Sequence, residues 1–166
     1  MKMKVLSMFG LCCLLLAGCA RFIVPEIGSV AEEKSRIVYD VDEKQEGVLS
    51  TKDLHLEYSL VENDNGVRFT GELAFDRSLT NSFPGMKTFF LKLNWLDASG
   101  NVLKTVDISP QFSYLSYAPD KLKINKTIES APGSSFICFN YYGVFQGEKP
   151  DVSEEWDILL FPFTAP

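Results

Sequence analysis

The stretch "KTFFLKLNWLD", residues 87–97, decides the fold class of this chain. Every second position on one side is apolar or aromatic: Phe89, Leu91, Leu93 and Trp95. The positions between them, Phe90 to Leu96, form the opposite side and include Lys92 and Asn94. A period of two residues is typical of a β-strand. "DASGN", 97–101, follows as a hairpin loop, and "VLKTVDI", 102–108, is the returning strand.

The same alternation recurs along most of the remaining chain. Further strands are predicted at 36–42, 54–60, 67–75, 111–117, 122–128, 136–145 and 156–163. Turn-forming residues separate them, for example "ENDNG" at 62–66 and "APGSS" at 131–135. The segment 76–85 is expected to be a longer connection, and no segment shows a convincing helical period. About seven to nine strands with regular turns predict an all-β fold, an antiparallel sandwich over one core.

Three pieces in order resemble the FxLYD-type immunoglobulin-like domains of bacterial envelope proteins. They are "VRFTGELAF", "LKLNWLDASGNVL", with Trp95-Leu96-Asp97 in place of Leu-Tyr-Asp, and "APGSSFICF". The resemblance covers roughly residues 65–145. It implies an immunoglobulin-like sandwich that serves as an accessory or binding module, with no catalytic residues to carry over.

The beginning of the chain has the plan of a secretory signal peptide. "MKMK" supplies two positive charges, and a run of 13 apolar or small residues, 5–17, follows. As a helix this run would be about 20 Å long, whereas a bilayer core is about 30 Å thick. A transmembrane span is therefore not expected here.

Leu16-Ala17-Gly18-Cys19 resembles the lipobox of bacterial lipoproteins. The resemblance implies cleavage before Cys19, a diacylglycerol on its sulfur and an acyl chain on the new N-terminus. Two or more acyl chains would anchor the protein stably. In enterobacteria-like sorting, a residue other than Asp after the cysteine implies the outer membrane, and here that residue is Ala20. We therefore expect a lipid-anchored protein of the bacterial cell envelope, facing the periplasm.

These boundaries divide the chain into three parts. Residues 1–18 are the expected signal peptide, 19–35 the lipidated N-terminus and tether, and 36–166 the sandwich domain. Removing Lys2 and Lys4 leaves 16 − 2 = 14 basic residues against 22 acidic ones, a net charge of −8. Such a chain lacks the basic footprint of a nucleic-acid-binding protein. Only Cys138 would remain unmodified, so no intramolecular disulfide is expected, and it is interpreted as a small buried residue.

Residues that could carry chemistry are few. His55 is the only histidine, and alternation places Glu57 and Ser59 on its face, which suits a solvated face as well as a catalytic group. One histidine and one free cysteine make a zinc site improbable, and no loop matches an EF-hand. We expect no enzyme activity, no metal and no cofactor besides the covalent lipid on Cys19.

Aromatic residues are the remaining candidates for binding. In "QFSYLSY", 111–117, serines alternate with Tyr114 and Tyr117, and Trp156 begins the last strand. If exposed, these rings could stack on a sugar or on a protein partner. The favoured interpretation is a non-catalytic interaction or assembly module with an envelope protein as partner. The alternative is a carbohydrate- or peptidoglycan-binding module that uses Tyr114, Tyr117 or Trp156.

Overall fold

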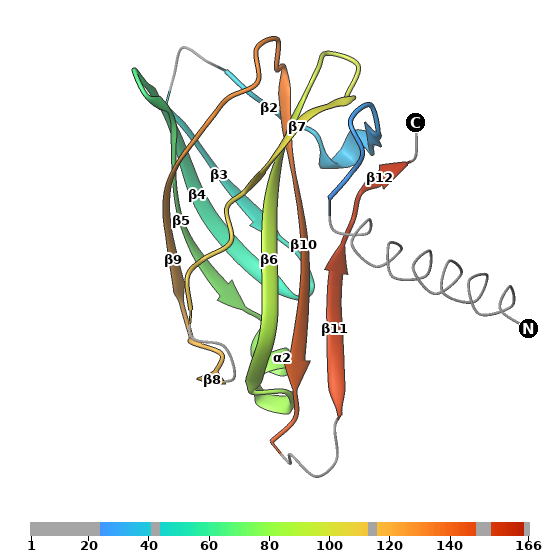
Figure 1. Cartoon of the computed structure of the whole chain (residues 1–166). Coiled ribbons are helices and arrows are strands. Elements are labelled where there is room, and N and C mark those ends of the chain that lie inside the picture. The colour runs from blue at the N-terminus through green and yellow to red at the C-terminus, as the bar shows by residue number, and fades with distance from the viewer. Residues whose placement is uncertain (1–23, 41–43, 113–115, 149–153, 165–166) are drawn as a thin grey trace, which may run out of the picture.

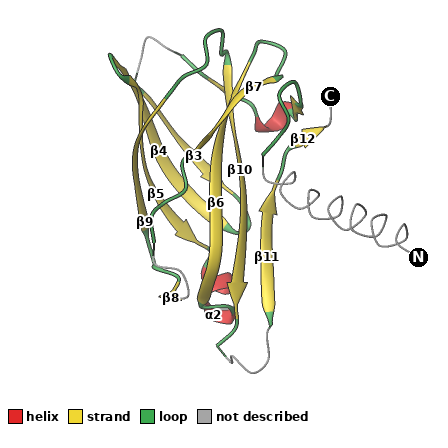
Figure 2. Ribbon diagram, viewed as in Figure 1, coloured by secondary structure: helices red, strands yellow, loops and turns green. Residues whose placement is uncertain are grey.

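Two antiparallel β-sheets face each other across the core (Figures 1 and 2). The computed structural model describes residues 24–40, 44–112, 116–148 and 154–164. Sheet I has the order β3 (Gln45–Ser50), β4 (Leu54–Asn63), β5 (Gly66–Phe75), β9 (Leu122–Ile128). Sheet II has the order β11 (Glu155–Leu160), β10 (Phe136–Gln146), β6 (Gly85–Leu96), β7 (Val102–Asp107). The predicted all-β sandwich is confirmed.

Short elements extend this frame. β2 (Ile37–Val38) pairs with β10, β8 (Ser116–Tyr117) pairs with β6, and β1 (Val30–Ala31) pairs with β12 (Phe163–Thr164). The helical elements among the described residues are η1 (Glu33–Ser35) and α2 (Arg77–Ser82). In Figure 1, α2 and β8 lie at one end of the sandwich, and the β6–β7 hairpin lies at the other. We call these the helix end and the hairpin end.

The path of the chain is that of an immunoglobulin-like sandwich. β3, β4 and β5 form a meander in sheet I, and the chain then crosses to the β6–β7 hairpin in sheet II. It returns to place β9 beside β5, crosses again to place β10 beside β6, and ends with β11 outside β10. These crossings between two sheets give Greek-key connectivity.

The alternation in 87–97 has the predicted outcome. Phe89, Leu91, Leu93 and Trp95 of β6 are buried in the main core. Aromatic contacts link the two sheets there: Tyr58 of β4 lies edge-on to Phe139 of β10 at 5.0 Å between ring centroids. Edge-on aromatic pairs at this separation contribute beyond the area they bury. β6 is therefore central both in the order of its sheet and in the packing.

The strand β3 was not foreseen, because its alternation is interrupted at a glycine. Gly47 pairs with Tyr58 in the neighbouring strand. A Cβ at Gly47 would lie 2.4 Å from the hydroxyl oxygen of Tyr58, so the tyrosine ring occupies the space that a side chain would need. The ring of Tyr58 from β4 thus fills the core-facing position of Gly47. The sequence of β3 alone therefore shows no apolar residue at this position and no clear alternation.

Two other segments are less regular than expected. In 36–42 the described strand is Ile37–Val38 alone, and in 111–117 it is Ser116–Tyr117.

The connection 76–85 contains the helix α2, whose first turn is capped by Asp76: the backbone N–H of Ser78 donates to its Oδ1 at 2.8 Å. Leu79 on this helix is buried, so α2 closes the helix end of the core.

The expected tether packs against the domain in the part that the structure describes, residues 24–35. The backbone N–H of Ala31 donates to Gly100 O at 2.9 Å, and that of Gly28 donates to Val102 O at 3.0 Å. Ala31 is buried with Leu96, Val102 and Cys138 in a second, smaller cluster on the outer face of sheet II. Gly28 and Ala31, which belong to the expected tether, are therefore packed against sheet II.

Candidate functional site

The three aromatic residues singled out in the sequence differ in position. Tyr117 is 70% exposed and Trp156 is 50% exposed, whereas Tyr114 lies outside the described residues. Both described rings are near the helix end of sheet II. Tyr117 pairs with Gly85, and Trp156 pairs with Phe145.

The register places Tyr117 and Trp156 on opposite sides of the sheet. Cross-strand partners point to the same face, and successive residues point to opposite faces. Phe145 is buried in the main core, so Trp156 lies on the core side, at the edge of the sheet. Gly85 precedes the buried Met86, so Tyr117 lies on the outer face. The two rings therefore do not form one continuous aromatic row.

Trp156 is partly used by the fold. Its ring stacks on Phe83 with 5.7 Å between centroids and an interplanar angle of 26°. Phe83 immediately follows α2 and packs against the main core. The pair thus covers the helix end of the core. Trp156 therefore has a structural role, and the part of its side chain that does not contact Phe83 is exposed.

Tyr117 borders a groove of about 300 Å³ on the outer face of sheet II. Its lining includes Gly85, which has no side chain, together with Lys87, Gln146 and Glu148. A Cβ at Gly85 would lie 3.3 Å from the carbonyl oxygen of Gln146, so a larger residue at position 85 would narrow the groove. An aromatic wall beside amide and charged groups suits a small polar ligand with one apolar face. The sequence did not indicate Lys87, Gln146 or Glu148, because they are brought together only by the pairing of β6 with β10.

His55, Glu57 and Ser59 share the outer face of sheet I, as the alternation of β4 predicts. His55 Nε2 lies 3.6 Å from Glu57 Oε1, and both side chains are exposed. An exposed contact of this kind between polar side chains contributes little free energy because solvent screens it. The arrangement is that of a solvated sheet face.

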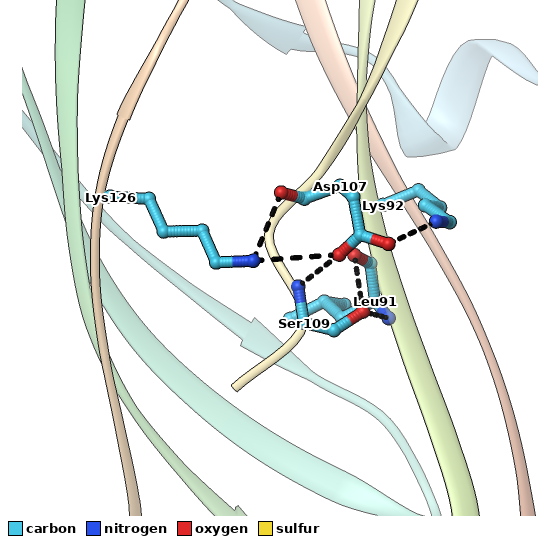
Figure 3. A network of polar contacts seen from close by, with 5 residues as sticks. All are labelled: Leu91, Lys92, Asp107, Ser109 and Lys126. Atoms are coloured by element: carbon cyan, nitrogen blue, oxygen red, sulfur yellow. Dashed lines mark hydrogen bonds and ion pairs between the residues drawn. The ribbon is translucent and has the colours of Figure 1, made fainter. Parts of the chain in front are cut away.

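A polar network joins the edges of the two sheets around Asp107 (Figure 3). Lys92 of β6 forms an ion pair with Asp107 Oδ2, and Lys126 of β9 lies 3.6 Å from its Oδ1. Lys126 Nζ also donates to the backbone carbonyl of Asp107 at 3.2 Å, and the N–H of Ser109 donates to Oδ1 at 2.8 Å. One carboxylate thus holds groups from β6, β9 and the chain that leaves β7.

The same network shifts the acidity of Asp107. Partial burial alone would raise its pKa, but hydrogen bonds from Lys92 and Ser109 and the charge of Lys92 lower the pKa to about 2. The Ser109 hydroxyl accepts the N–H of Leu91 at 2.9 Å, so it continues the hydrogen bonding of β6 beyond the end of β7. The network therefore fixes where the chain leaves sheet II.

Cys138 lies fully buried in the second cluster, in agreement with its interpretation as a core residue. Burial raises the pKa of its thiol to about 11, although its contact with Ser35 acts in the opposite direction. A thiol in this state has little thiolate at neutral pH and is a poor nucleophile.

Two further observations bear on the described part of the chain. Among residues 24–40, 44–112, 116–148 and 154–164, no three His, Cys, Asp or Glu side chains are grouped as a metal site requires. None of the helices described within these ranges is long and apolar enough to cross a bilayer. Comparisons with models of protein families, with curated proteins and with solved structures found no match to this chain.

Proposed function

We propose that this chain is a lipid-anchored lipoprotein of the bacterial cell envelope whose sandwich is a non-catalytic interaction or assembly module. The observation that carries the anchor is the motif Leu16-Ala17-Gly18-Cys19 after a basic start and a short apolar run. Diacylglycerol on Cys19 and an acyl chain on its amino group would hold the domain at the membrane. Ala20 after the cysteine favours the periplasmic face of the outer membrane.

A binding role for the domain is supported by how its surface is arranged. Charged side chains pair with one another across strands, as Lys87 does with Glu155 and Lys121 with Glu72. The exposed ring of Tyr117 borders a groove. Exposed aromatic residues with adjacent polar groups are typical of interaction surfaces.

The substitution Cys19→Ala tests the anchor. It should move the protein from the membrane fraction to the soluble fraction and abolish incorporation of labelled palmitate. The matched control is Cys138→Ala, which removes the other cysteine expected to remain after processing and should leave fractionation and labelling as in wild type. Membrane association and labelling of Cys19→Ala equal to wild type would refute the anchor.

The groove beside Tyr117 favours a second candidate function, binding of a glycan such as peptidoglycan. A single ring would cover one sugar, with Gln146 and Glu148 as hydrogen-bonding groups at the side. Tyr117→Ala should then abolish co-sedimentation with purified peptidoglycan, whereas Trp156→Ala should not. Equal co-sedimentation of wild type and Tyr117→Ala would exclude this candidate.

A further inference from the structure

Three large apolar side chains are exposed in the N-terminal part of the described chain, near the hairpin end of sheet II. Val24 is 46% exposed, Ile27 68% and Val38 67%. Val38 pairs with Phe136, which packs against the second cluster, so alternation directs both side chains to the outer face. Val24 and Ile27 lie beside Leu103, Lys104 and Thr105 of β7. We call Val24, Ile27 and Val38 the N-terminal patch.

The chain between the proposed anchor and this patch is short. Five residue steps separate Cys19 from Val24, and a fully extended chain spans at most about 18 Å over that length. From Val24 onward the chain is held against the domain, with backbone hydrogen bonds from Gly28 to Val102 and from Ala31 to Gly100. A lipidated Cys19 therefore cannot place the membrane surface far from the N-terminal patch.

The opposite surfaces of the domain differ from this patch in position and in polarity. Tyr117 pairs with Gly85 of β6, and Thr105, beside Val24 and Ile27, pairs with Asn94 of the same strand. Gly85 and Asn94 are nine residues apart, which corresponds to about 30 Å of strand. The outer face of sheet I is densely charged: Glu46, Glu57, Glu72 and Lys123 line it, and Lys121 forms an ion pair with Glu72. A face covered with charged side chains is costly to press into the apolar boundary of a bilayer, because those groups lose their hydration.

Resting on the anchor proposed at Cys19, we propose that the N-terminal patch lies against the lipid surface. In this orientation Val24, Ile27 and Val38 contact the interfacial region of the bilayer, and the charged outer face of sheet I is turned to the solvent. The helix end with Tyr117 is held away from the anchor. The occupant of the patch is the membrane, because the acyl chains on Cys19 would enter the bilayer and at most about 18 Å of extended chain joins Cys19 to Val24.

A fluorescent probe at two matched positions tests this orientation. Val38→Cys and Val48→Cys both replace an exposed valine in a strand at a sheet edge, Val48 being 57% exposed on the outer face of sheet I. The native Cys138 is fully buried and is spared by a thiol-reactive label. The full lipoprotein, purified from membranes, is labelled and reconstituted in phosphatidylethanolamine–phosphatidylglycerol vesicles that contain a nitroxide-labelled lipid.

The expected result is strong quenching at residue 38 and quenching at least about three-fold weaker at residue 48, since interfacial contact buries groups about 5–10 Å deep. Ile27→Cys, which lies outside the strands, should behave like Val38→Cys. Equal quenching at 38 and 48, or stronger quenching at 48, overturns the orientation. Mass spectrometry of the same preparation separates the two proposals: Cys19 without lipid overturns the anchor and the orientation together, whereas lipidated Cys19 with equal quenching overturns the orientation alone.

Discussion

The hydroxyl of Tyr141 in β10 donates a 2.8 Å hydrogen bond to Asp53 Oδ2, in the turn between β3 and β4. Both residues are buried; Tyr141 lies in a strand of sheet II, whereas Asp53 lies in a turn that joins two strands of sheet I. Thr51 lies 2.9 Å from the same hydroxyl through its Oγ1, which also accepts the N–H of Leu54 at 3.1 Å. The tyrosine therefore ties the turn of sheet I to the middle of sheet II. Burial and the neighbouring carboxylate keep the Tyr141 pKa far above its usual value, although Thr51 acts in the opposite direction.

Tyr141→Phe should lower the free energy of unfolding by about 1–3 kcal/mol, because it leaves the buried Asp53 carboxylate without this donor. Urea denaturation followed by fluorescence measures the loss. The control is Tyr142→Phe at the next position. Its hydroxyl makes an exposed 3.4 Å contact with Asp157, and its loss should change the free energy of unfolding by no more than about 0.5 kcal/mol. Equal effects of the two substitutions would show that the inter-sheet hydrogen bond does not stabilise the fold.

Asp107→Asn should destabilise the protein in a pH-dependent manner. Because the pKa of Asp107 is lowered to about 2 in the folded state, its stabilising contribution is complete above its ordinary pKa of 3.8 and is lost as the pH falls toward 2. The full shift would correspond to about 2 kcal/mol, and exposure of about half of the side chain to solvent reduces this to about 1 kcal/mol. Unfolding free energies of wild type and Asp107→Asn, measured from pH 7 to pH 2, should converge at the acid end. A constant difference over this range would contradict the prediction.

Gly47→Ala should destabilise the sandwich by about 1–3 kcal/mol, because the new methyl group and the Tyr58 ring cannot occupy the same space. Thermal or urea unfolding measures the change. Gly147→Ala is the matched control: among the described residues, the nearest atoms to a Cβ there belong to Glu154 at 3.7 Å, and the change should stay within about 0.5 kcal/mol. A Gly47→Ala variant as stable as wild type would mean that Tyr58 moves without cost.

The Cys138 thiol should be almost inert while the protein is folded. With a pKa of about 11 in place of the ordinary 9.0, its thiolate fraction at pH 8 falls about 100-fold, and full burial slows access further. The measurement is the rate of reaction with a coloured disulfide reagent, using the chain from residue 19 onward with Cys19→Ala so that one thiol remains. The reaction in urea should be at least about 100-fold faster than under native conditions. Similar rates would contradict the burial of Cys138.

The strands with strong alternation could be predicted from the sequence, and those whose core positions are filled from elsewhere could not. β6 shows its two faces directly, because Phe89, Leu91, Leu93 and Trp95 all reach the core with their own side chains. β3 has Gly47 at such a position, and Tyr58 of the next strand fills the space. The helix α2 has six residues, too few to show a helical period, although Asp76 and Ser78 supply its cap.

The relative positions of the candidate binding residues could likewise be predicted within one strand but not between strands. Alternation correctly placed Glu57 on the face of His55, since both lie on one strand. It could not place Tyr117 and Trp156 relative to each other, because their sides depend on how β8 and β11 pair with other strands. Asp107 and Lys126 are likewise joined only by the packing of β7 against β9.

The sequence by itself determined the class of fold, because a two-residue period can bury one face of a strand only in a sheet, and it carries the Cys19 motif on which the proposed anchor rests. The tertiary structure decided which side chains meet. Strand register places Tyr117 outside and Trp156 toward the core, and sheet packing brings Tyr141 to Asp53. The tertiary structure also holds residues 24–35 against sheet II. The chain between Cys19 and Val24 is therefore the length left to reach the membrane in the proposed orientation. These relationships depend on contacts between residues far apart in the chain, which no local pattern encodes.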